Sequence, residues 1–391
     1  MMARLGDVCA KITDGSHNPP QGISCSEYLM LSSKNIYDDD ISFDDPRYLS
    51  KENYETENKR TQISAGDILL TIVGTVGRAA VVSKTEKKIC LQRSVAVIKP
   101  KQELIDSRFL MYQLQSMRTH LEQEARGVAQ KGIYLRQVEN LQIKVPSRGE
   151  QLQVVSNLDQ ISELISLRKQ QLAKLDELVK ARFVELFGDP ASNSLGWKTD
   201  YLKNVTSKIG SGATPKGGKE SYQADGITLI RSMNVHDGRF EYKDLAHITD
   251  EQAKQLDNVT IEENDVFINI TGASVARSCI VPKHILPARV NQHVAIIRCI
   301  TPVLNPVFAN NMFLNQSFKG QLLDIGETGG ATRQAITKQQ LETLEVILPP
   351  IEMQNQFAAF VEQTDKSKLA IQESLAELET LKKALMQKYF G

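Results

Sequence analysis

One stretch near the start of the sequence has the residue types of a catalytic loop. HNPPQG at 17–22 resembles the Asn-Pro-Pro-aromatic loop with which amino-methyltransferases stack a flipped base on an aromatic ring. Gln21 stands where that ring is needed. Almost no chain precedes Asn18, so a glycine-rich cofactor loop has no room before it. This stretch therefore does not predict methyl transfer by the chain itself.

A second stretch resembles a phosphate-binding loop. ATPKGGKES at 213–221 has a lysine after two glycines, as that loop requires. However, Ala213 replaces the first glycine, and Glu220 follows Lys219 where serine or threonine should bind the metal of a nucleotide. We therefore do not expect nucleotide binding here.

The histidines and cysteines form no metal-binding or nucleophile pattern. The six histidines, at 17, 120, 236, 247, 284 and 293, include no His-x3-His spacing and no partner for a nucleophile motif. The five cysteines, at 9, 25, 90, 279 and 299, are odd in number and scattered, which fits reduced thiols. The carboxylates show no nuclease pattern. The sequence therefore predicts a binding protein that is not an enzyme, without catalytic residues or a metal site.

Composition predicts a folded, multidomain chain in the cytoplasm. The chain has 391 residues, of which 41% are hydrophobic, enough for two or three packed domains. It has no apolar run of about 18 residues, and its first residues lack the apolar core of a secretory signal. Lys and Arg equal Asp and Glu at 47 each. Residues 78–101 are basic, whereas residues 38–45 hold five aspartates that we interpret as a solvated face.

The chain is one unit written twice. KARFVELFG in mid-chain is matched by KALMQKYFG at the end. A constant offset of 203 positions pairs 127–188 with 330–391 without a gap, and 17 of these 62 pairs are identical. Further upstream, LQRSVAVI at 91–98 matches VNQHVAII at 290–297. A period of about 200 residues is too long for a solenoid repeat and indicates tandem duplication of a whole unit.

Each unit begins with about 145 residues of mixed strands and loops. GDILLTIVGTVGRAAVV at 66–82 and NDVFINITGASVARSCIV at 264–281 are apolar runs typical of strands. Glycine and proline predict loops over 13–22 and 210–218. Apolar residues at helical spacing predict one short helix over 106–124.

Each unit ends in a long predicted helix. Residues 150–187 contain no proline or glycine, and Gly188-Asp-Pro ends them. The second helix is expected over 351–390. Both carry the 3-4 apolar alternation of a coiled-coil seam. The seam residues are Leu158, Ile161, Ile165, Leu172, Leu175 and Val179 in the first helix, and Val361, Ile371, Leu375, Leu378 and Leu385 in the second.

The apolar stripe of each long helix needs a partner. We expect the other helix, in an antiparallel coiled coil, although packing on its own globular part or on another chain is the alternative. Phe187 and Phe390 would then lie beside different globular parts, related by a pseudo-two-fold axis. Duplex DNA fits such an arrangement, because half-sites about 34 Å apart present the same face of the duplex to two DNA-binding domains. Divergence between the two units predicts an asymmetric target.

Several of these motifs together resemble a known family, the specificity subunits of type I restriction–modification systems. They are LGDV near the start, GTVGR, QRSVAVI with its counterpart NQHVAII, and Phe-Gly after each long helix. The most specific is GGATRQAITKQQLETLEVILPPIEMQNQF, which ends at Phe357 and resembles the family's junction between a target recognition domain and a conserved spacer helix. The first copy departs from it, with Ser147-Arg148-Gly149 in place of Pro350-Ile351-Glu352. The start of the first helix is therefore less well defined.

The resemblance implies a fold, a function and partners. It implies an α+β chain with target recognition domains at 1–146 and 189–349 and spacer helices at 147–188 and 350–391. Each domain would read one half of a split, asymmetric double-stranded DNA target, while the helices set the gap and dock two modification (methyltransferase) subunits. Those subunits would bring S-adenosylmethionine and methylate adenine at N6. Restriction subunits using ATP and Mg would complete the host-defence complex. This chain itself, in the prokaryotic cytoplasm and on the nucleoid when bound to DNA, would hold no cofactor.

The residues that contact DNA are expected on loops that follow glycines. Arg and Lys bind phosphates and guanine, and Asn, Gln and Ser supply other base contacts. The resemblance does not locate them, because recognition domains vary most where they read bases. Arg78 and Arg277 are the best pair, since they match across the repeat after a glycine-containing turn. The predicted DNA-binding residues are Ser16, His17, Asn18, Arg78, Arg93 and Lys131 in the first domain, and Thr214, Lys216, Lys219, Arg277, Gln292, His293 and Arg333 in the second.

Two other function classes remain open. A coiled-coil scaffold with two protein-binding heads would fit the neutral net charge, and it predicts no salt-sensitive DNA binding. Reading of DNA predicts an affinity that falls steeply with salt. An enzyme with unrecognised chemistry predicts methylation or cleavage by the isolated chain.

Overall fold

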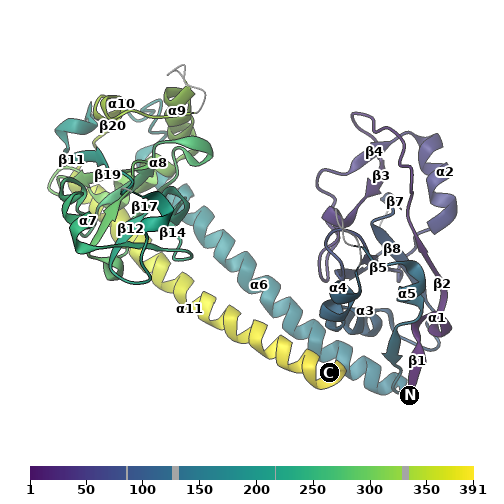
Figure 1. The fold of residues 1–391 in the computed structure, drawn as a ribbon. Helices are drawn as coiled ribbons and strands as arrows, with labels where there is room; N and C mark the ends of the chain where they lie inside the picture. The colour runs from purple at the N-terminus through teal and green to yellow at the C-terminus, as the bar shows by residue number, and fades with distance from the viewer. Residues whose placement is uncertain (85–86, 126–131, 216, 328–333) are drawn as a thin grey trace. The chain divides into compact units, whose positions relative to one another are not determined.

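The computed structural model describes residues 1–84, 87–125, 132–215, 217–327 and 334–391. The chain divides into two compact units, which we call unit 1 (residues 1–169 with 373–391) and unit 2 (residues 170–372). Each unit combines helices and strands (Figure 1), which confirms the predicted α+β class. The division cuts through both long helices, so each unit holds one globular part and a segment of each helix.

Unit 1 contains two main sheets and a short strand pair. Along the chain come β1 (Met2–Arg4), α1 (Leu5–Val8), β2 (Cys9–Asp14), β3 (Tyr28–Leu31), η1 (Ser33–Asn35), β4 (Arg47–Leu49), α2 (Lys51–Thr61), β5 (Ile68–Thr71), β6 (Ala79–Val81), β7 (Lys88–Leu91) and β8 (Val95–Pro100). Then follow α3 (Ser107–Ser116), α4 (Arg118–Glu124), α5 (Leu135–Glu139), β9 (Gln142–Lys144) and the start of α6 (Arg148–Phe187). The sheets have the orders β2-β8-β5-β6, β4-β3-β7 and β1-β9. β3 and β7 pair in parallel, and the other pairs are antiparallel.

Unit 2 repeats this topology. Its strands are β10 (Thr199–Tyr201), β11 (Thr206–Ser211), β12 (Ile227–Ile230), β13 (Val235–His236), β14 (Arg239–Phe240), β15 (Ala246–Ile248), β16 (Val266–Asn269), β17 (Ser278–Ile280), β18 (Ala288–Val290), β19 (Val294–Cys299) and β20 (Glu345–Ile347). Its α-helices are α7 (Asp250–Lys254), α8 (Pro306–Leu314), α9 (Gln316–Glu327), α10 (Lys338–Glu342) and α11 (Ile351–Phe390); its 3-10 turns are η2 (Leu202–Asn204), η3 (Gly218–Ser221), η4 (Ser232–Asn234), η5 (Asp257–Val259), η6 (Gly272–Ser274) and η7 (Lys283–Ile285). The sheet orders β11-β19-β16-β17, β15-β12-β18 and β10-β20 match those of unit 1, and the β13-β14 hairpin is an addition. The duplication seen in the sequence is therefore a duplication of the fold.

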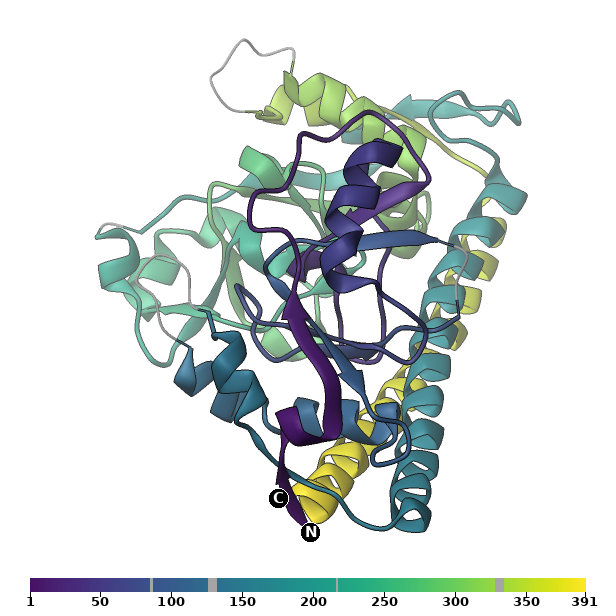
Figure 2. The same cartoon turned by 90° about the vertical axis from the view of Figure 1, so that its right-hand side faces the viewer.

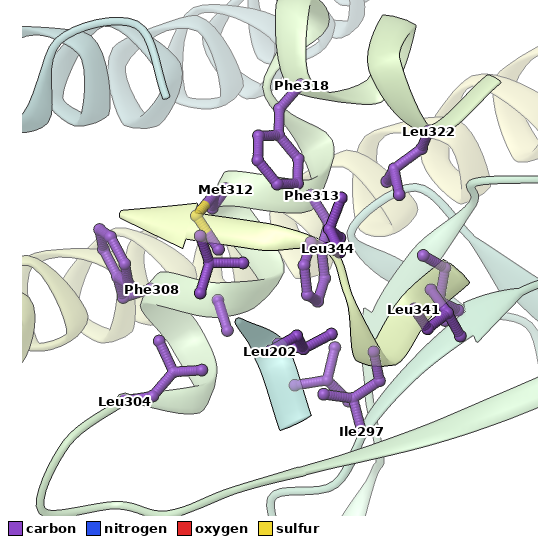
Figure 3. Close-up of a cluster of buried hydrophobic side chains, with 14 of the residues drawn as sticks. Leu202, Ile297, Leu304, Phe308, Met312, Phe313, Phe318, Leu322, Leu341 and Leu344 are labelled. Atoms are coloured by element: carbon purple, nitrogen blue, oxygen red, sulfur yellow. The ribbon is translucent and has the colours of Figure 1, made fainter. Parts of the chain in front are cut away.

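The four-stranded sheet of each unit is buried on both faces. In β16, Val266 and Ile268 face the core shared with α8, whereas Phe267 faces the three-stranded sheet. Figure 3 shows side chains of β19, α8, α9 and α10 meeting in the first of these cores. Unit 1 repeats the arrangement, with Ile68 and Leu70 on one side of β5 and Leu69 on the other. Burial of both faces explains why these strands are continuous apolar runs rather than alternating patterns.

The helix predicted over 106–124 is two helices, α3 and α4, which meet at Met117. The bend places Arg118 against Gly77, where a Cβ would lie 3.2 Å from the Arg118 Cα. The Arg118 guanidinium donates to the Asp38 carboxylate and, at 3.3 Å, to the Gly77 carbonyl oxygen. These distant partners, which helical periodicity cannot reveal, accompany the change of direction.

A buried glutamine fastens each long helix to its globular part. Gln151 in α6 accepts a hydrogen bond from the Asp106 N–H at 2.7 Å and donates to the carbonyl oxygens of Leu104 and Pro146. Gln354 in α11 bonds in the same way to Asn305, Val303 and Pro349, with the Asn305 N–H donating at 2.9 Å. Asp106 and Asn305 in turn cap α3 and α8. One side chain therefore ties the start of a long helix to the start of a short one.

The segments of α6 and α11 that belong to one unit lie side by side and antiparallel (Figures 1 and 2). In unit 1, Asn157 donates to the Tyr389 hydroxyl at 2.8 Å, and Lys169 pairs with Glu379 at 3.3 Å. In unit 2, Lys368 pairs with Asp176 at 2.7 Å. The predicted seam residues are buried or half-buried in these segments. The alternative of helices that pack only on their own globular part does not describe either unit.

The ends of the two helices are buried in different ways. Phe187 is fully buried in unit 2, with its ring centroid 4.8 Å from that of Phe308 and near Phe183 and Phe357. Phe390 is half-buried in unit 1, 5.3 Å from Phe109. The two phenylalanines therefore lie beside different globular parts, as antiparallel pairing predicts.

In unit 1, polar contacts accompany the apolar packing of α6 and α11 on the globular part. Asp159 of α6 accepts from Arg108 at 2.8 Å and from the Tyr112 hydroxyl at 2.7 Å. Burial raises the pKa of Tyr112 above its ordinary value. Lys382 of α11 pairs with Asp39 at 2.7 Å. The interpretation of the aspartate run as a solvated face is therefore wrong for Asp39.

Candidate nucleic-acid interface

The loop that follows the first strand of each four-stranded sheet crosses another strand at a glycine. A Cβ on Gly15 would lie 2.1 Å from the Leu91 carbonyl oxygen, and a Cβ on Gly212 would lie 1.7 Å from that of Val290. No side chain fits at these distances, so the close backbone approach requires glycine at both positions. The crossing holds the loops after β2 and β11 against the β7–β8 and β18–β19 turns.

In unit 1, these loops form one edge of the sheets. We call residues 15–18, 72–78 and 92–94 the loop edge of unit 1. Backbone hydrogen bonds join its three segments: the Arg93 N–H donates to the Ser16 oxygen at 2.8 Å and the Ile72 N–H to the Ser94 oxygen at 2.9 Å. Another, from the Gln92 N–H to the Leu31 oxygen at 2.9 Å, joins the turn to β3. The backbone of the β7–β8 turn is therefore fixed from three sides.

In unit 2, the corresponding loop edge consists of residues 212–215, 270–277 and 291–293. Two of the three backbone bonds recur: the Ile270 N–H donates to the His293 oxygen at 3.0 Å, and the Asn291 N–H to the Ile230 oxygen at 3.0 Å. The Gly212 N–H donates to the Asn291 oxygen at 3.1 Å. The duplicated fold thus presents one backbone frame twice, with different side chains on it.

The matched arginines lie directly before β6 and β17, and each contacts a ring. The Arg78 guanidinium stacks over the Tyr37 ring, 5.1 Å from its centroid. Arg277 occupies the same place in unit 2, with one guanidinium nitrogen 3.5 Å from His236 Nδ1. Both arginines are half-buried. The Tyr37 ring beneath the Arg78 guanidinium restricts it and leaves its outer edge available for hydrogen bonds, whereas His236 contacts the edge of the Arg277 guanidinium.

Three of the predicted residues of unit 2 belong to one hydrogen-bonded chain. The Thr214 hydroxyl donates to the Gln292 side-chain oxygen, and Gln292 Nε2 lies 3.1 Å from His293 Nε2. His293 Nδ1 in turn contacts the Thr271 hydroxyl. If the Gln292 amide donates to the ring, the ring proton is on Nδ1. Each hydrogen bond in the series from Thr214 through Gln292 and His293 to Thr271 then has one donor and one acceptor. Thr214 and Gln292 are exposed, so this series of hydrogen bonds ends at the protein surface.

The predicted residues of the first loop in unit 1 differ in accessibility. Ser16 is 8% exposed and contributes its backbone to the turn. His17 is exposed, and its Nε2 lies 2.8 Å from Asp14, which also binds Arg60. Asn18 is exposed. Ser16 therefore positions its neighbours, whereas His17 and Asn18 present polar side chains.

Not all of the predicted DNA-binding residues are described by the structure. Lys131, Lys216 and Arg333 fall outside the described residues, and the side chain of Lys219 is not described. The neighbours of two of them reach the loop edges, since Gly132 forms a bridge with Val73 and the Gly272 N–H donates to the Gln334 oxygen at 3.0 Å.

The rings that contact the two arginines were not predicted from the sequence. Tyr37 and His236 directly follow the matched stretches LSSKNI and IRSMNV. Extending that match by one residue would have paired them. Thr271 was also missed, because its role depends on a contact with His293 across the sheet.

The described part of the chain contains no group of three or more His, Cys, Asp or Glu side chains arranged to hold a metal ion. Within the same residues, no helix combines the length and the apolar content that a membrane span requires. Burial raises the pKa of the Cys90 and Cys279 thiols to about 12.

Comparison with solved structures supports the fold. The chain is similar over its full length to the S subunit of a type I restriction-modification system from M. genitalium, with a TM-score of 0.58, 12% identity and 96% of that chain covered. It is also similar to a chain in a structure of type I R-M complex assembly, with a TM-score of 0.55, 19% identity and 97% coverage of that chain. At these identities the likeness concerns the fold alone.

Comparison of sequences adds named relatives. The chain is 32% identical over 158 residues to the type I restriction enzyme EcoBI specificity subunit of Escherichia coli, a match that spans 39% of this chain and only 33% of that protein. It is 21% identical over 356 residues to the putative type I restriction enzyme MjaX specificity subunit of Methanocaldococcus jannaschii, spanning 82% of this chain and 76% of that one.

The family model for the type I restriction modification DNA specificity domain matches twice, at residues 2–177 and 195–381. The two matches cover most of both copies of the duplicated unit, including the loop edges and most of each long helix. This chain belongs to the type I restriction modification DNA specificity family.

Proposed function

We propose that this chain is the sequence-reading subunit of a type I restriction–modification complex. The recognition domains at 1–146 and 189–349 each read one half of a bipartite, asymmetric double-stranded DNA target through their loop edges. The helical segments at 147–188 and 350–391 set the gap between the halves and dock two modification (methyltransferase) subunits.

The observation that carries this proposal is the loop edge built twice on one backbone frame. A rigid frame with exposed polar tips suits base contacts, which need side chains held in fixed geometry. The repetition of the frame suits two half-sites, and the different side chains at equivalent tips suit an asymmetric target. A protein-binding scaffold does not require two such matched frames.

In this proposal the chain contributes recognition and assembly, not catalysis. S-adenosylmethionine belongs to the modification subunits, and ATP and Mg belong to restriction subunits where these are present. The chain itself holds no cofactor and acts in the cytoplasm, where the DNA is. Purified chain alone should neither methylate nor cleave DNA, and either activity would contradict this division of labour.

The test is to lengthen both helices together. We would insert one heptad after Lys169 in α6 and one after Gln372 in α11, at the boundary between the two compact units. Seven residues add about 10 Å to each helix and preserve the coiled-coil register. Selection from randomised DNA duplexes should then return the same bases in each half-site with a longer gap.

The matched control inserts the heptad in α6 alone, which shifts the seam of one helix against the other and should abolish selection of a bipartite site. An unchanged gap in the double insertion would show that the helices do not set the distance. Wild-type chain without any sequence preference, or with binding insensitive to salt, would favour a protein scaffold.

A further inference from the structure

The two loop edges carry different side chains at equivalent backbone positions, the middle residues of the β7–β8 and β18–β19 turns. We call these two positions the tips. Arg93 is the middle residue of the β7–β8 turn, and Gln292 is the middle residue of the β18–β19 turn. Both turns close with the same bond, from the Val95 N–H to the Gln92 oxygen at 3.1 Å and from the Val294 N–H to the Asn291 oxygen at 3.4 Å. The frame is common, so the difference between the tips is one of side-chain chemistry.

The Arg93 side chain is available for a ligand. It is exposed, and within the described residues its guanidinium has no hydrogen-bond or ion-pair partner, whereas its backbone N–H is held by Ser16. A guanidinium presents a planar fork of donors. That fork matches the two acceptors, O6 and N7, of guanine in the major groove.

The Gln292 side chain is held in place before any ligand arrives. Its oxygen accepts from Thr214, and its nitrogen contacts His293, which contacts Thr271. A carboxamide has two lone pairs and two N–H bonds, so one of each stays available. An acceptor beside a donor matches N6 and N7 of adenine, and fixing the amide reduces the entropy lost on binding.

We propose that Arg93 selects guanine in the half-site read by unit 1 and that Gln292 selects adenine in the half-site read by unit 2. The two bases occupy equivalent places in their half-sites, because the residues occupy equivalent places in the frame. Thr214 and His293 are positioning residues that keep the Gln292 amide edge turned outward. This inference rests on the proposed function, since it assumes that the loop edges face DNA.

The test uses full-length chain and selection from randomised DNA duplexes, with the enriched motif read by sequencing. Arg93→Gln should change one guanine to adenine in one half-site only, and Gln292→Arg should make the opposite change in the other. Each new preference should favour the new base about tenfold. Thr214→Val should weaken the adenine preference without creating another.

Two further variants separate base reading from phosphate binding. Arg93→Lys keeps the charge but loses the fork, so the guanine preference should fall about tenfold while binding to unrelated duplexes persists. Arg4→Gln is the matched control, because Arg4 is exposed on β1 and paired with Asp7. It should leave the motif unchanged.

The outcomes distinguish this inference from the proposed function. A wild-type chain without a motif would overturn both. A wild-type bipartite motif that stays the same in Arg93→Gln and Gln292→Arg, with equally weakened binding to all duplexes, would overturn the inference alone, because phosphate contacts carry no sequence information.

Discussion

Gln151 and Gln354 make the same set of hydrogen bonds, although they lie 203 positions apart in the sequence. Each is almost fully buried, at 1% and 0% exposure. Replacement of either by alanine would leave one buried N–H and two carbonyl oxygens without their partner. We expect Gln354→Ala to lower the free energy of unfolding of unit 2 by about 2–4 kcal/mol.

Trp197 makes this measurable, because it is the chain's single tryptophan, and its indole donates to the Phe187 oxygen in unit 2. During urea unfolding, its fluorescence should show the loss of stability of unit 2 in Gln354→Ala. The same transition should change little in Gln151→Ala. Gln153→Ala is the control, since Gln153 is exposed. Equal effects of Gln153→Ala and Gln151→Ala on amide exchange at Asp106 would contradict the role assigned to Gln151.

Replacing the phenylalanine at the end of α6 should destabilise the protein more than replacing the one at the end of α11. Phe187→Ala removes a fully buried ring from a cluster of four and should destabilise unit 2 by about 3–5 kcal/mol. Phe390→Ala removes a half-buried ring from unit 1 and should cost less. Trp197 fluorescence should follow the first variant only; a comparable shift of the tryptophan transition in Phe390→Ala would count against separate burial.

Gly210 in β11 and Gly212 just after that strand offer a matched pair. At Gly212, a new Cβ would meet the Val290 carbonyl oxygen, whereas at Gly210 it would meet nothing within 4 Å. Gly212→Ala should therefore lower stability by about 1–3 kcal/mol and displace the β18–β19 turn, while Gly210→Ala should do neither. Urea unfolding and DNA selection check both effects. Loss of selectivity in Gly210→Ala as well would mean that the crossing is not the cause.

Asp189, two residues after the end of α6, should make stability depend on acid pH. The Ser317 hydroxyl donates to its carboxylate at 2.5 Å and the Ala191 N–H at 2.9 Å, and the Ser317 bond is the main cause that lowers the pKa of Asp189. A carboxyl group whose folded pKa is lowered stabilises the fold above its unfolded pKa of about 3.9, and this contribution disappears as the pH falls through the folded value.

The Asp189→Asn variant should accordingly be less stable than wild type at pH 7, and the difference should shrink as the pH falls below about 4. Trp197 fluorescence in urea, recorded at several pH values, gives both curves. A difference that is constant with pH would show that the charge of Asp189 contributes nothing.

The elements that depend on local pattern could be predicted from the sequence. The long helices follow from their seam residues and from Gly188-Asp-Pro, and the buried strands from apolar runs such as 66–82. The constant offset of 203 even paired Gln151 with Gln354 before their hydrogen bonds were visible. Repetition within one chain therefore acted as a comparison of two related sequences.

What could not be predicted depends on contacts between distant residues. Asp39 and Lys382 are 343 positions apart, and neither composition nor periodicity joins them. Gly15 was predicted only as part of a loop, but its role comes from the Leu91 carbonyl oxygen that it passes. Single residues of the loop edges were named from the sequence, whereas the hydrogen-bonded series from Thr214 to Thr271 forms only once the fold has brought its members together.

In unit 1 the long helices are held partly by the polar contacts of Asp159 and Asp39, and in unit 2 by the phenylalanine cluster. The two units should therefore differ in how their stability depends on salt and on temperature. Attractions between partly exposed charges weaken as salt is added, whereas apolar packing weakens on cooling. Adding salt should therefore loosen the helices first from unit 1, and cold should loosen them first from unit 2. The two copies of the duplicated fold should therefore differ in the condition that first releases their helices.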